Sequence, residues 1–417
     1  PTEARGMTEL DRSVFRKTLQ VPKLMIEAPK LPEVLNKVKE KLLKFPHLKT
    51  VSGAEVKAIL LNPEVVKSWE DVQEVGVDQE ALVWEEIELK YENFKYDDVL
   101  KAILPADQEN LSSFSQIGHI IHVNLKDHLL PYRSVIGQVL LDKIPRCRSV
   151  VNKIHSIDNE FRNFRMEVLA GEEVFRVEVK ENGCVFEFDF SRVYWNPRLG
   201  SEHERIVKSL PSGSHFCDVF AGVGPFSVPA ARKGCHVLAN DLNPDSFQWL
   251  KHNAKRNKVD KLLEVRNKDA REFILEDLKG FLVSFWLRKE PKAAFTVVMN
   301  LPALAVEFLD AFSGLLVDQP ELKSLERSLP LLHVYTFVKG GVPEDARASA
   351  EACLGHKISH FDSISFVRNV APNKDMFRVS FHLSDDILFT RKCMKRSGDP
   401  VEELKHPKIH CSPQEDQ

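Results

Sequence analysis

The chain has 417 residues, of which 43% are hydrophobic, and its 58 basic and 61 acidic side chains leave a formal net charge of −3. At roughly 150 residues per domain this length predicts two to three domains, and no apolar run is long enough to span a membrane. Near-neutrality excludes a uniformly basic surface but not a local basic groove, because phosphates respond to local potential.

The seven cysteines are widely scattered and form no C-x-x-C pair. We therefore expect no disulfide scaffold and no bound metal, and we expect a reducing compartment. The N-terminus lacks the apolar core of a secretory signal and is too acidic for a typical transit peptide, although a leader could precede Pro1.

Residues 1–113 are predicted to form a small N-terminal domain. The first 30 residues contain three prolines without a clear period and are interpreted as an extended lead-in. A helix is expected at Leu31–Phe45, a strand at Trp84–Leu89 and a second helix at Tyr96–Leu104. Pro105–Ser115 is interpreted as a linker.

Residues 114–200 are predicted to form a middle, β-rich domain. A compact strand is expected at Gly118–Leu125 and an amphipathic helix at Ser134–Lys143. Two strands, Val174–Lys180 and Gly183–Phe190, flank an Asn-Gly pair, which is a strong hairpin signal because both residues tolerate a positive φ.

Residues 201–390 alternate between strands and helices, which predicts an α/β domain with a largely parallel sheet covered on both faces. The expected strands are His215–Phe220, His236–Asn240, Leu262–Val265, Phe295–Met299 and Leu331–Val338, with a closing pair at Phe361–Asn369 and Phe377–Leu383. Residues 391–417 are charged, contain proline and are predicted to be a mobile tail.

A glycine-containing loop follows the first strand of this alternating domain. Gly222 and Gly224 let backbone approach a ligand closely at the carboxyl end of a strand, where open α/β sheets bind their ligands. A Gly-x-Gly pair alone is equally compatible with a tight turn. The next strand ends at Asp241, where a carboxylate can accept hydrogen bonds from a ribose, although this acid could instead cap the following helix.

Two further strand ends carry polar groups. The third strand ends at Asp269-Ala270 and the fourth at Asn300-Leu301-Pro302. A P-loop motif and the third glycine of the dinucleotide fingerprint are absent, so a cofactor without phosphates is favoured. With polar groups at these strand ends, the domain resembles class I S-adenosylmethionine-dependent methyltransferases. This resemblance implies that the domain has their Rossmann-like sheet.

One segment narrows the resemblance. Arg192–Arg205, which reads RVYWNPRLGSEHER, precedes the cofactor loop. Combined with Phe161-Arg162, the loop FAGVGPF and the NLP motif at Asn300, it is similar to the archaeal–eukaryotic tRNA (guanine-37 N1)-methyltransferases. The motif NDLNP at Asn240 resembles the eukaryotic branch of that family. By position, residues 1–113 would be the family's tRNA-elbow-binding domain.

The resemblance implies methyl transfer from S-adenosylmethionine to N1 of the guanosine at position 37 of tRNA. Neutral guanine carries a proton on N1, so a base must remove it, and charge that develops on O6 needs a donor. The general base falls on Glu202, which could otherwise be an exposed carboxylate at a helix start, and the donor for O6 falls on Arg162. Tyr194, Asn300 and Pro302 are the remaining catalytic candidates.

Cofactor contacts carried over from the family are His203, Phe220, Gly222, Gly224, Asp241, Leu242, Asp269, Ala270 and Asn300. His203 could equally be a solvated surface residue. Ala303 replaces the aromatic residue of the wider nitrogen-methyltransferase signature, so stacking on the base is expected from Tyr194 or Trp195. Two basic clusters are candidates for phosphate contacts or simply solvated faces: Lys251, Lys255, Arg256, Lys258 and Lys261, and Arg146, Arg148 and Lys153.

Two alternatives remain open. One is a transferase of the wybutosine pathway that moves the aminocarboxypropyl group of the same cofactor, and the other is a non-catalytic tRNA-binding module. The expected partner is tRNA and no membrane is expected. We expect a monomer in the cytoplasm and nucleus, with a mitochondrial matrix pool if a leader precedes this sequence.

Overall fold

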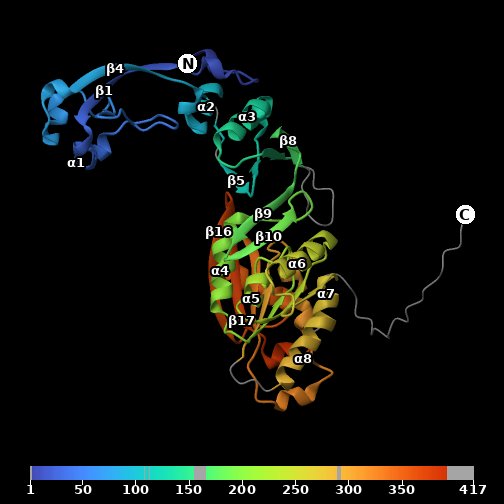
Figure 1. The fold of residues 1–417 in the computed structure, drawn as a ribbon. Helices are drawn as coiled ribbons and strands as arrows, with labels where there is room; N and C mark the ends of the chain where they lie inside the picture. The colour runs from blue at the N-terminus through green and yellow to red at the C-terminus, as the bar shows by residue number, and fades with distance from the viewer. Residues whose placement is uncertain (1, 108, 112, 155–165, 289–292, 392–417) are drawn as a thin grey trace, which may run out of the picture. The chain divides into compact units, whose positions relative to one another are not determined.

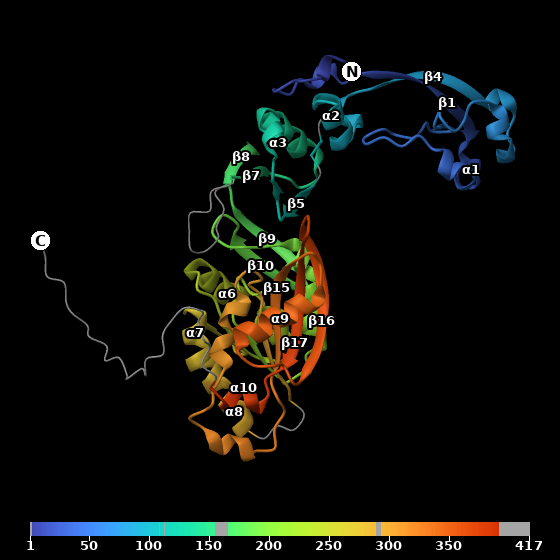
Figure 2. The same ribbon diagram turned by 180° about the vertical axis from the view of Figure 1, so that it is seen from behind.

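The computed structural model describes residues 2–107, 109–111, 113–154, 166–288 and 293–391 (Figures 1 and 2). The chain divides into two compact units. Unit 1 contains residues 1–203 and 248–257, and unit 2 contains residues 204–247 and those from 258 onward. Arg162 and the predicted tail after residue 391 lie outside the described residues.

The first sheet of unit 1 has four antiparallel strands in the order β2-β3-β1-β4. Its elements are β1 (Lys17–Glu27), α1 (Leu31–Val38), β2 (Val51–Ser52), β3 (Val56–Leu60) and β4 (Leu82–Leu89). The expectation that residues 1–30 form an extended lead-in is wrong, because β1 is a central strand of this sheet. Pro22 obscured the strand, since proline usually marks a turn or a sheet edge, yet it lies opposite Trp84 in the β1–β4 ladder.

The predicted helix at Leu31–Phe45 is shorter than expected. Helix α1 ends at Val38, a 3-10 turn follows, and Leu42 forms a β-bridge with Leu61. Val34 and Val38 pack into the core of the first sheet with Leu24. The strand predicted at Trp84–Leu89 is confirmed by β4.

A second four-stranded sheet has the order β5-β6-β7-β8. Its elements are β5 (Phe114–Ile117), β6 (Ile120–Val123), α3 (Arg133–Lys143), β7 (Ser149–Lys153) and β8 (Met166–Gly171). The helices predicted at Tyr96–Leu104 and Ser134–Lys143 are confirmed by α2 (Tyr96–Ile103) and α3. One hydrophobic core joins Phe15, Tyr91 and Val99 to Val135 of α3. The domain boundary near residue 113 stays a prediction.

The predicted hairpin is formed by β9 (Arg176–Glu181) and β10 (Cys184–Asp189). Its two turn residues, Asn182 and Gly183, have φ values of 50° and 73°, as the tight turn that suits twisted strands requires. Along β10, the Asn257 side chain accepts from the Val185 amide at 2.9 Å and donates to the Val185 carbonyl at 2.7 Å. Asn253 accepts from the Glu187 amide at 2.9 Å. The hairpin therefore has side-chain partners along its backbone.

Unit 2 is built on a seven-stranded sheet in the order β13-β12-β11-β14-β15-β17-β16 (Figure 1). The strands are β11 (His215–Asp218), β12 (His236–Asn240), β13 (Leu263–Arg266), β14 (Phe295–Met299), β15 (Leu331–Lys339), β16 (Phe361–Ala371) and β17 (Lys374–His382). The first five in this order are parallel, and β17 runs antiparallel to both of its neighbours.

Helices flank this sheet. They are α4 (Gly200–Ser209, which begins in unit 1), α5 (Ser227–Arg232), α6 (Pro244–Arg256, which ends in unit 1), α7 (Ala270–Phe273), α8 (Lys279–Leu287), α9 (Pro343–Leu354) and α10 (Asp385–Phe389). Helix α9 packs against β15, β16 and β17 (Figure 2). Phe273 and Leu282, from α7 and α8, share one core with Val297 of β14 and Phe377 of β17.

This topology confirms the predicted Rossmann-like fold. The strand order reverses beside β11, because β12 and β14 lie on opposite sides of it. Open α/β sheets bind ligands outside the carboxyl ends of the strands at such a point. Among the described residues, no helix has the length and apolar character needed to cross a bilayer.

Candidate active site

The loop after β11 is held by the end of β12. The Ala221 amide donates to the Asn240 carbonyl at 2.8 Å, and the Gly222 amide donates to Oδ2 of Asp241 at 2.8 Å. Gly222 has a φ of +55°, and a Cβ placed on it would meet no atom of the described residues within 4 Å. Gly222 therefore borders open space at the carboxyl edge of the sheet.

Asp241 links the loop to the start of α6. Its Oδ1 accepts from the Asn243 amide at 2.9 Å, while Asn243 itself caps α6 by accepting from the Asp245 amide at 2.9 Å. The helix cap that we considered for Asp241 therefore belongs to Asn243. Burial raises the pKa of Asp241 to about 6, although the Gly222 and Asn243 amides favour its ionised form.

Asp218 is a further acid at this edge, and the sequence interpretation did not single it out as a site residue. It ends β11, is fully buried, and accepts from the Ser227 hydroxyl at 2.7 Å. Burial raises its pKa to about 7, and the nearby Asp241 adds to the increase. Its place immediately before the glycine loop was the available signal.

The Asn240 side chain forms hydrogen bonds with the segments that follow the two neighbouring strands, and the sequence did not indicate this role. Its side-chain amide donates to the Lys268 carbonyl at 3.0 Å and to the Val219 carbonyl at 3.3 Å, and its Oδ1 accepts from the Lys268 amide at 3.0 Å. The loops after β11, β12 and β13 are consequently fixed to one buried side chain, which preorganises this edge of the sheet.

The end of β13 carries two of the predicted cofactor residues. Asp269 is exposed and caps α7 by accepting from the Arg271 amide at 2.8 Å, whereas Ala270 is buried. Leu242, at the end of β12, is 43% exposed. Asp269 thus has a structural role as a helix cap through one of its two carboxylate oxygens.

The end of β14 carries Asn300 and Pro302. Within the part of the chain that the structure describes, Asn300 Oδ1 is buried and has no hydrogen-bond partner. The Pro302 carbonyl accepts from the Phe337 amide of β15 at 3.2 Å. A buried amide oxygen without a partner is unfavourable, so this atom is suited to accept a hydrogen bond from a bound ligand.

Glu202 and His203 occupy the first turns of α4, and their side chains belong to unit 1. Glu202 is 5% exposed and His203 is 4% exposed. The structure therefore contradicts the alternatives that these residues are an exposed carboxylate and a solvated histidine. His203 Nδ1 lies 2.7 Å from Oε1 of Glu181, an acid at the hairpin tip that the sequence interpretation missed.

The two aromatic candidates for base stacking differ in exposure. Trp195 is 8% exposed and packs against Phe186 and Phe188, at centroid distances of 5.4 and 5.1 Å. The expectation that Trp195 could stack on a base is therefore wrong. Tyr194 is 58% exposed.

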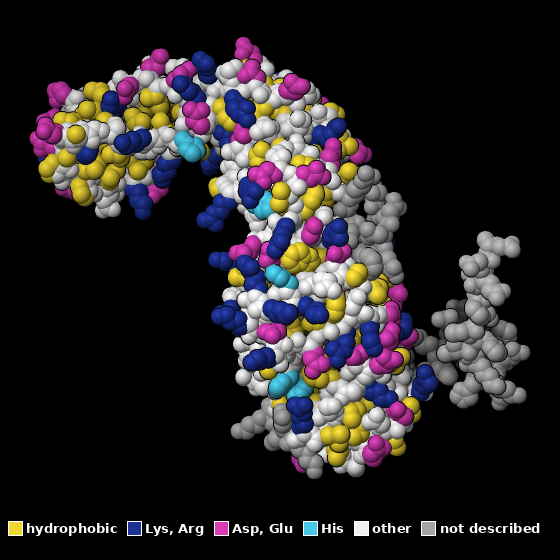
Figure 3. Space-filling view, turned by 45° about the vertical axis from the view of Figure 1, so that its right-hand side comes forward, with side chains coloured by type: hydrophobic (Ala, Val, Ile, Leu, Met, Phe, Trp, Pro, Cys, Tyr) yellow, Lys and Arg dark blue, Asp and Glu magenta, His cyan; other side chains and the backbone are white. Residues whose placement is uncertain are grey.

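The basic clusters are partly neutralised. Arg256 forms ion pairs with Glu178 and Glu187, and Arg148 forms one with Glu172. In Figure 3, basic and acidic side chains alternate over the visible face without a continuous basic block. Exposed lysines 255, 258 and 261 remain candidates for phosphate contacts.

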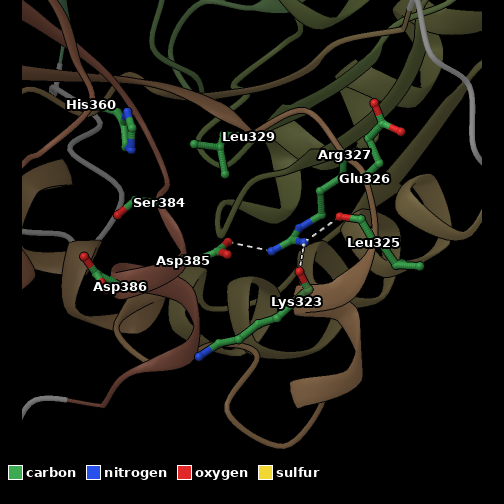
Figure 4. A pocket seen from close by; sticks show the side chains of 9 residues that line it. All are labelled: Lys323, Leu325, Glu326, Arg327, Leu329, His360, Ser384, Asp385 and Asp386. Carbon is green, nitrogen blue, oxygen red and sulfur yellow. Dashed lines mark hydrogen bonds and ion pairs between the residues drawn. The ribbon is translucent and has the colours of Figure 1, made fainter.

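A cavity of about 470 Å³ lies at the opposite edge of the unit 2 sheet (Figure 4). Arg327 pairs with Asp385 at 2.5 Å and donates to the Lys323 and Leu325 carbonyls at 3.0 Å. Ser384 also lines it. The cavity is next to the amino ends of the parallel strands, and none of the described candidate site residues lines it.

Comparison with known proteins places these features in a family. Residues 177–322 match the TRM5/TYW2 methyltransferase domain, and residues 96–174 match the TYW2 N-terminal domain. A tRNA (guanine(37)-N(1))-methyltransferase of Anopheles gambiae is 52% identical over 97% of this chain and 74% of its own length. The enzyme of that name from Drosophila pseudoobscura pseudoobscura is 52% identical over 94% of this chain and 92% of its own length.

Among solved structures, the complex of aTrm5 with tRNALeu is similar in fold. Its TM-score is 0.62 at 22% identity, and the match covers 88% of this chain and 100% of that protein. The identities to the two insect enzymes extend over nearly the whole sequence, including both regions matched by the family descriptions. The chain belongs to the tRNA (guanine(37)-N(1))-methyltransferase family.

Proposed function

We propose that this chain transfers the methyl group of S-adenosylmethionine to N1 of the guanosine at position 37 of tRNA. The observation that carries this proposal is the carboxyl edge of the unit 2 sheet, where Gly222 borders open space and the partnerless oxygen of Asn300 is buried. The high identity to enzymes named for this reaction supports the same conclusion.

The residues at this edge fit a nucleoside cofactor without phosphates. Asp241 can accept from ribose hydroxyls in addition to its backbone donors, and the open space beside Gly222 allows the backbone to approach the ligand. Phe220, Gly224 and His203 are further proposed contacts. The proposed set also includes Leu242, Asp269, Ala270 and Asn300. S-adenosylmethionine supplies an electrophilic methyl group when it is bound here.

Glu202 is proposed to remove the N1 proton of guanine as the nitrogen attacks. A positioned general base typically contributes roughly 10²–10⁴-fold to a rate. Burial of Glu202 supports the assignment, because a glutamate is rarely buried without a specific partner or role. Arg162 is proposed to stabilise charge on O6; it lies outside the described residues.

Three residues are proposed to hold the target base. Tyr194 has the exposure that stacking on an unstacked tRNA base requires. Asn300 and Pro302 end β14, where the family resemblance places the residues that face the base. Tyr194 therefore takes the stacking role for which Trp195 is too buried.

A second candidate is transfer of the aminocarboxypropyl group to tRNA. It is favoured by one observation, the match of residues 96–174 to the TYW2 N-terminal domain. Against it, the two insect relatives that match most of this chain are both named as guanine-37 methyltransferases.

One experiment separates these functions. The chain is incubated with S-adenosylmethionine and a tRNA transcript carrying guanosine or adenosine at position 37, and nucleosides from the digested product are analysed by mass spectrometry. We expect 1-methylguanosine from the guanosine transcript and no methylated product from the other. A larger aminocarboxypropyl adduct, or methylation that ignores position 37, would overturn the proposal.

Three broader assignments are also proposals. The chain is proposed to act as a monomer, to reside in the cytoplasm and nucleus, with a mitochondrial matrix pool if a leader precedes this sequence, and to use residues 1–113 to bind the tRNA elbow. Light scattering measures the oligomeric state, fluorescent tagging of the full-length protein reports its compartment, and tRNA affinity after removal of residues 1–113 tests the elbow contact.

A further inference from the structure

The tip of the β9–β10 hairpin contacts the first turn of α4. Glu181 is the last residue of β9, and its Oε1 lies 2.7 Å from Nδ1 of His203. The side chains of His203 and Glu181 are 5% and 13% exposed. A carboxylate that accepts from Nδ1 fixes both the orientation and the tautomer of an imidazole.

The same carboxylate also meets the start of the helix. Its Oε2 lies 2.9 Å from the position that a Cβ on Gly200 would occupy. Gly200 has helical angles, φ −56° and ψ −37°, so its backbone conformation does not require glycine. A methyl group at this position would instead require the Glu181 carboxylate to shift. Beside it, the Asn182 side chain donates to the Gly200 carbonyl at 3.3 Å.

The hairpin is a firm support for these contacts. Its turn is fixed by the positive φ angles of Asn182 and Gly183. Further along, Asn253 and Asn257 bind the backbone of β10 through hydrogen bonds of 2.7 to 2.9 Å. Both the tip and the strand are therefore restrained, so a side chain on the tip can hold α4 in place.

We propose that Glu181 is a positioning residue for Glu202. Residues 200 and 203, which Glu181 contacts, lie on either side of Glu202 in the sequence. Glu181 thereby fixes the register and rotation of the turn that presents the Glu202 carboxylate. This inference rests on the proposed role of Glu202 as the general base.

The test is single-turnover methylation of tRNA by Glu181→Ala and Glu181→Gln, at saturating cofactor and tRNA. We expect Glu181→Ala to lower the rate about 10- to 100-fold, the range expected for misplacement of a catalytic group by roughly 1 Å. Glu181→Gln keeps an oxygen that accepts from His203, so most of the rate should return. Glu173→Ala, which removes an exposed acid just before the same hairpin, is the matched control and should be as fast as the parent.

A second pair of variants excludes simple loss of folding. Gly200→Ala places a methyl group against the Glu181 carboxylate and should displace it. We therefore expect a slower enzyme, although alanine has a higher helix propensity than glycine. In the Glu181→Ala background the same change should have no further effect, because the obstructing carboxylate is gone. Affinity for tRNA should stay within about threefold of the parent in every variant, because these contacts position catalytic groups and not the bound RNA.

The outcomes separate this inference from the proposed function. If Glu202→Gln is inactive while Glu181→Ala is as fast as the parent, the positioning role is wrong and the base assignment stands. If Glu202→Gln is fully active, the base assignment is wrong, and the positioning role falls with it. Independent, multiplicative effects of Gly200→Ala and Glu181→Ala would also overturn the inference.

Discussion

The amide of Gly222 donates a hydrogen bond to the Asp241 carboxylate at 2.8 Å, across the ends of β11 and β12. The two strands are parallel neighbours, so one contact fixes the glycine loop and the acid together. Because Asp241 also accepts from the Asn243 amide, its carboxylate is oriented before any ligand arrives. Such preorganisation reduces the ordering that binding would otherwise require.

Gly222→Ala should weaken cofactor binding more than it weakens the fold. An alanine at positive φ costs about 1–2 kcal/mol of stability, and the added methyl group would lie in the open space assigned to the ligand. Calorimetry with S-adenosylmethionine should show at least about a tenfold loss of affinity, equivalent to roughly 1.4 kcal/mol.

Gly213→Ala is the control for that measurement. Gly213 also has a positive φ, of 79°, and a Cβ on it would meet no described atom within 4 Å, but it precedes β11 at the opposite edge. Its substitution should lower thermal stability to a similar extent and leave cofactor affinity unchanged. Equal affinity losses in the two variants would show that backbone strain alone explains the effect.

Asp218 should make stability depend on pH. Its pKa is raised by burial from 3.8 to about 7, so its protonated form favours the folded state. That contribution is fully present below about pH 4 and is lost as the pH rises through about 7. Asp218→Asn cannot ionise, so its melting temperature relative to the parent should increase between pH 5 and 8. A difference that is constant with pH would show that Asp218 does not titrate in this range.

Alanine substitutions of Tyr194 and Trp195 should have different effects, the first on tRNA methylation and the second on stability. Tyr194→Ala removes an exposed ring and should reduce tRNA methylation while leaving the melting temperature near that of the parent. Base–aromatic stacking is worth about 1–3 kcal/mol, so the rate at low tRNA concentration should fall by about 5- to 150-fold. Trp195→Ala opens a cavity beside Phe186 and Phe188 and should destabilise unit 1 by about 3–5 kcal/mol. A fully active Tyr194→Ala variant would contradict the stacking role.

Local sequence patterns were sufficient for much of unit 2. Alternating strands and helices predicted the Rossmann-like sheet, and the closing pair corresponds to β16 and β17. In unit 1, the Asn182-Gly183 turn was predictable because its chemistry is local. The Gly222 loop and Asp241 could likewise be located from their places at consecutive strand ends.

Other features depend on contacts between distant residues. Strand β1 was missed because Pro22 resembles a breaker until β3 and β4 lie beside it. The contact of Glu181 with His203 joins residues on two elements, and a lone glutamate at a hairpin tip carries no such signal. Trp195 and Tyr194 are adjacent in sequence, so only packing shows that the first is buried and the second exposed.

The central claim is that Glu202 removes the N1 proton of guanosine 37. Single-turnover methylation by Glu202→Gln, measured alongside tRNA and cofactor affinity, tests it most directly. We expect both affinities to stay near those of the parent and the rate to fall by about 10²–10⁴-fold, as loss of a general base requires. A Glu202→Gln variant that methylates guanosine 37 as fast as the parent would contradict the account.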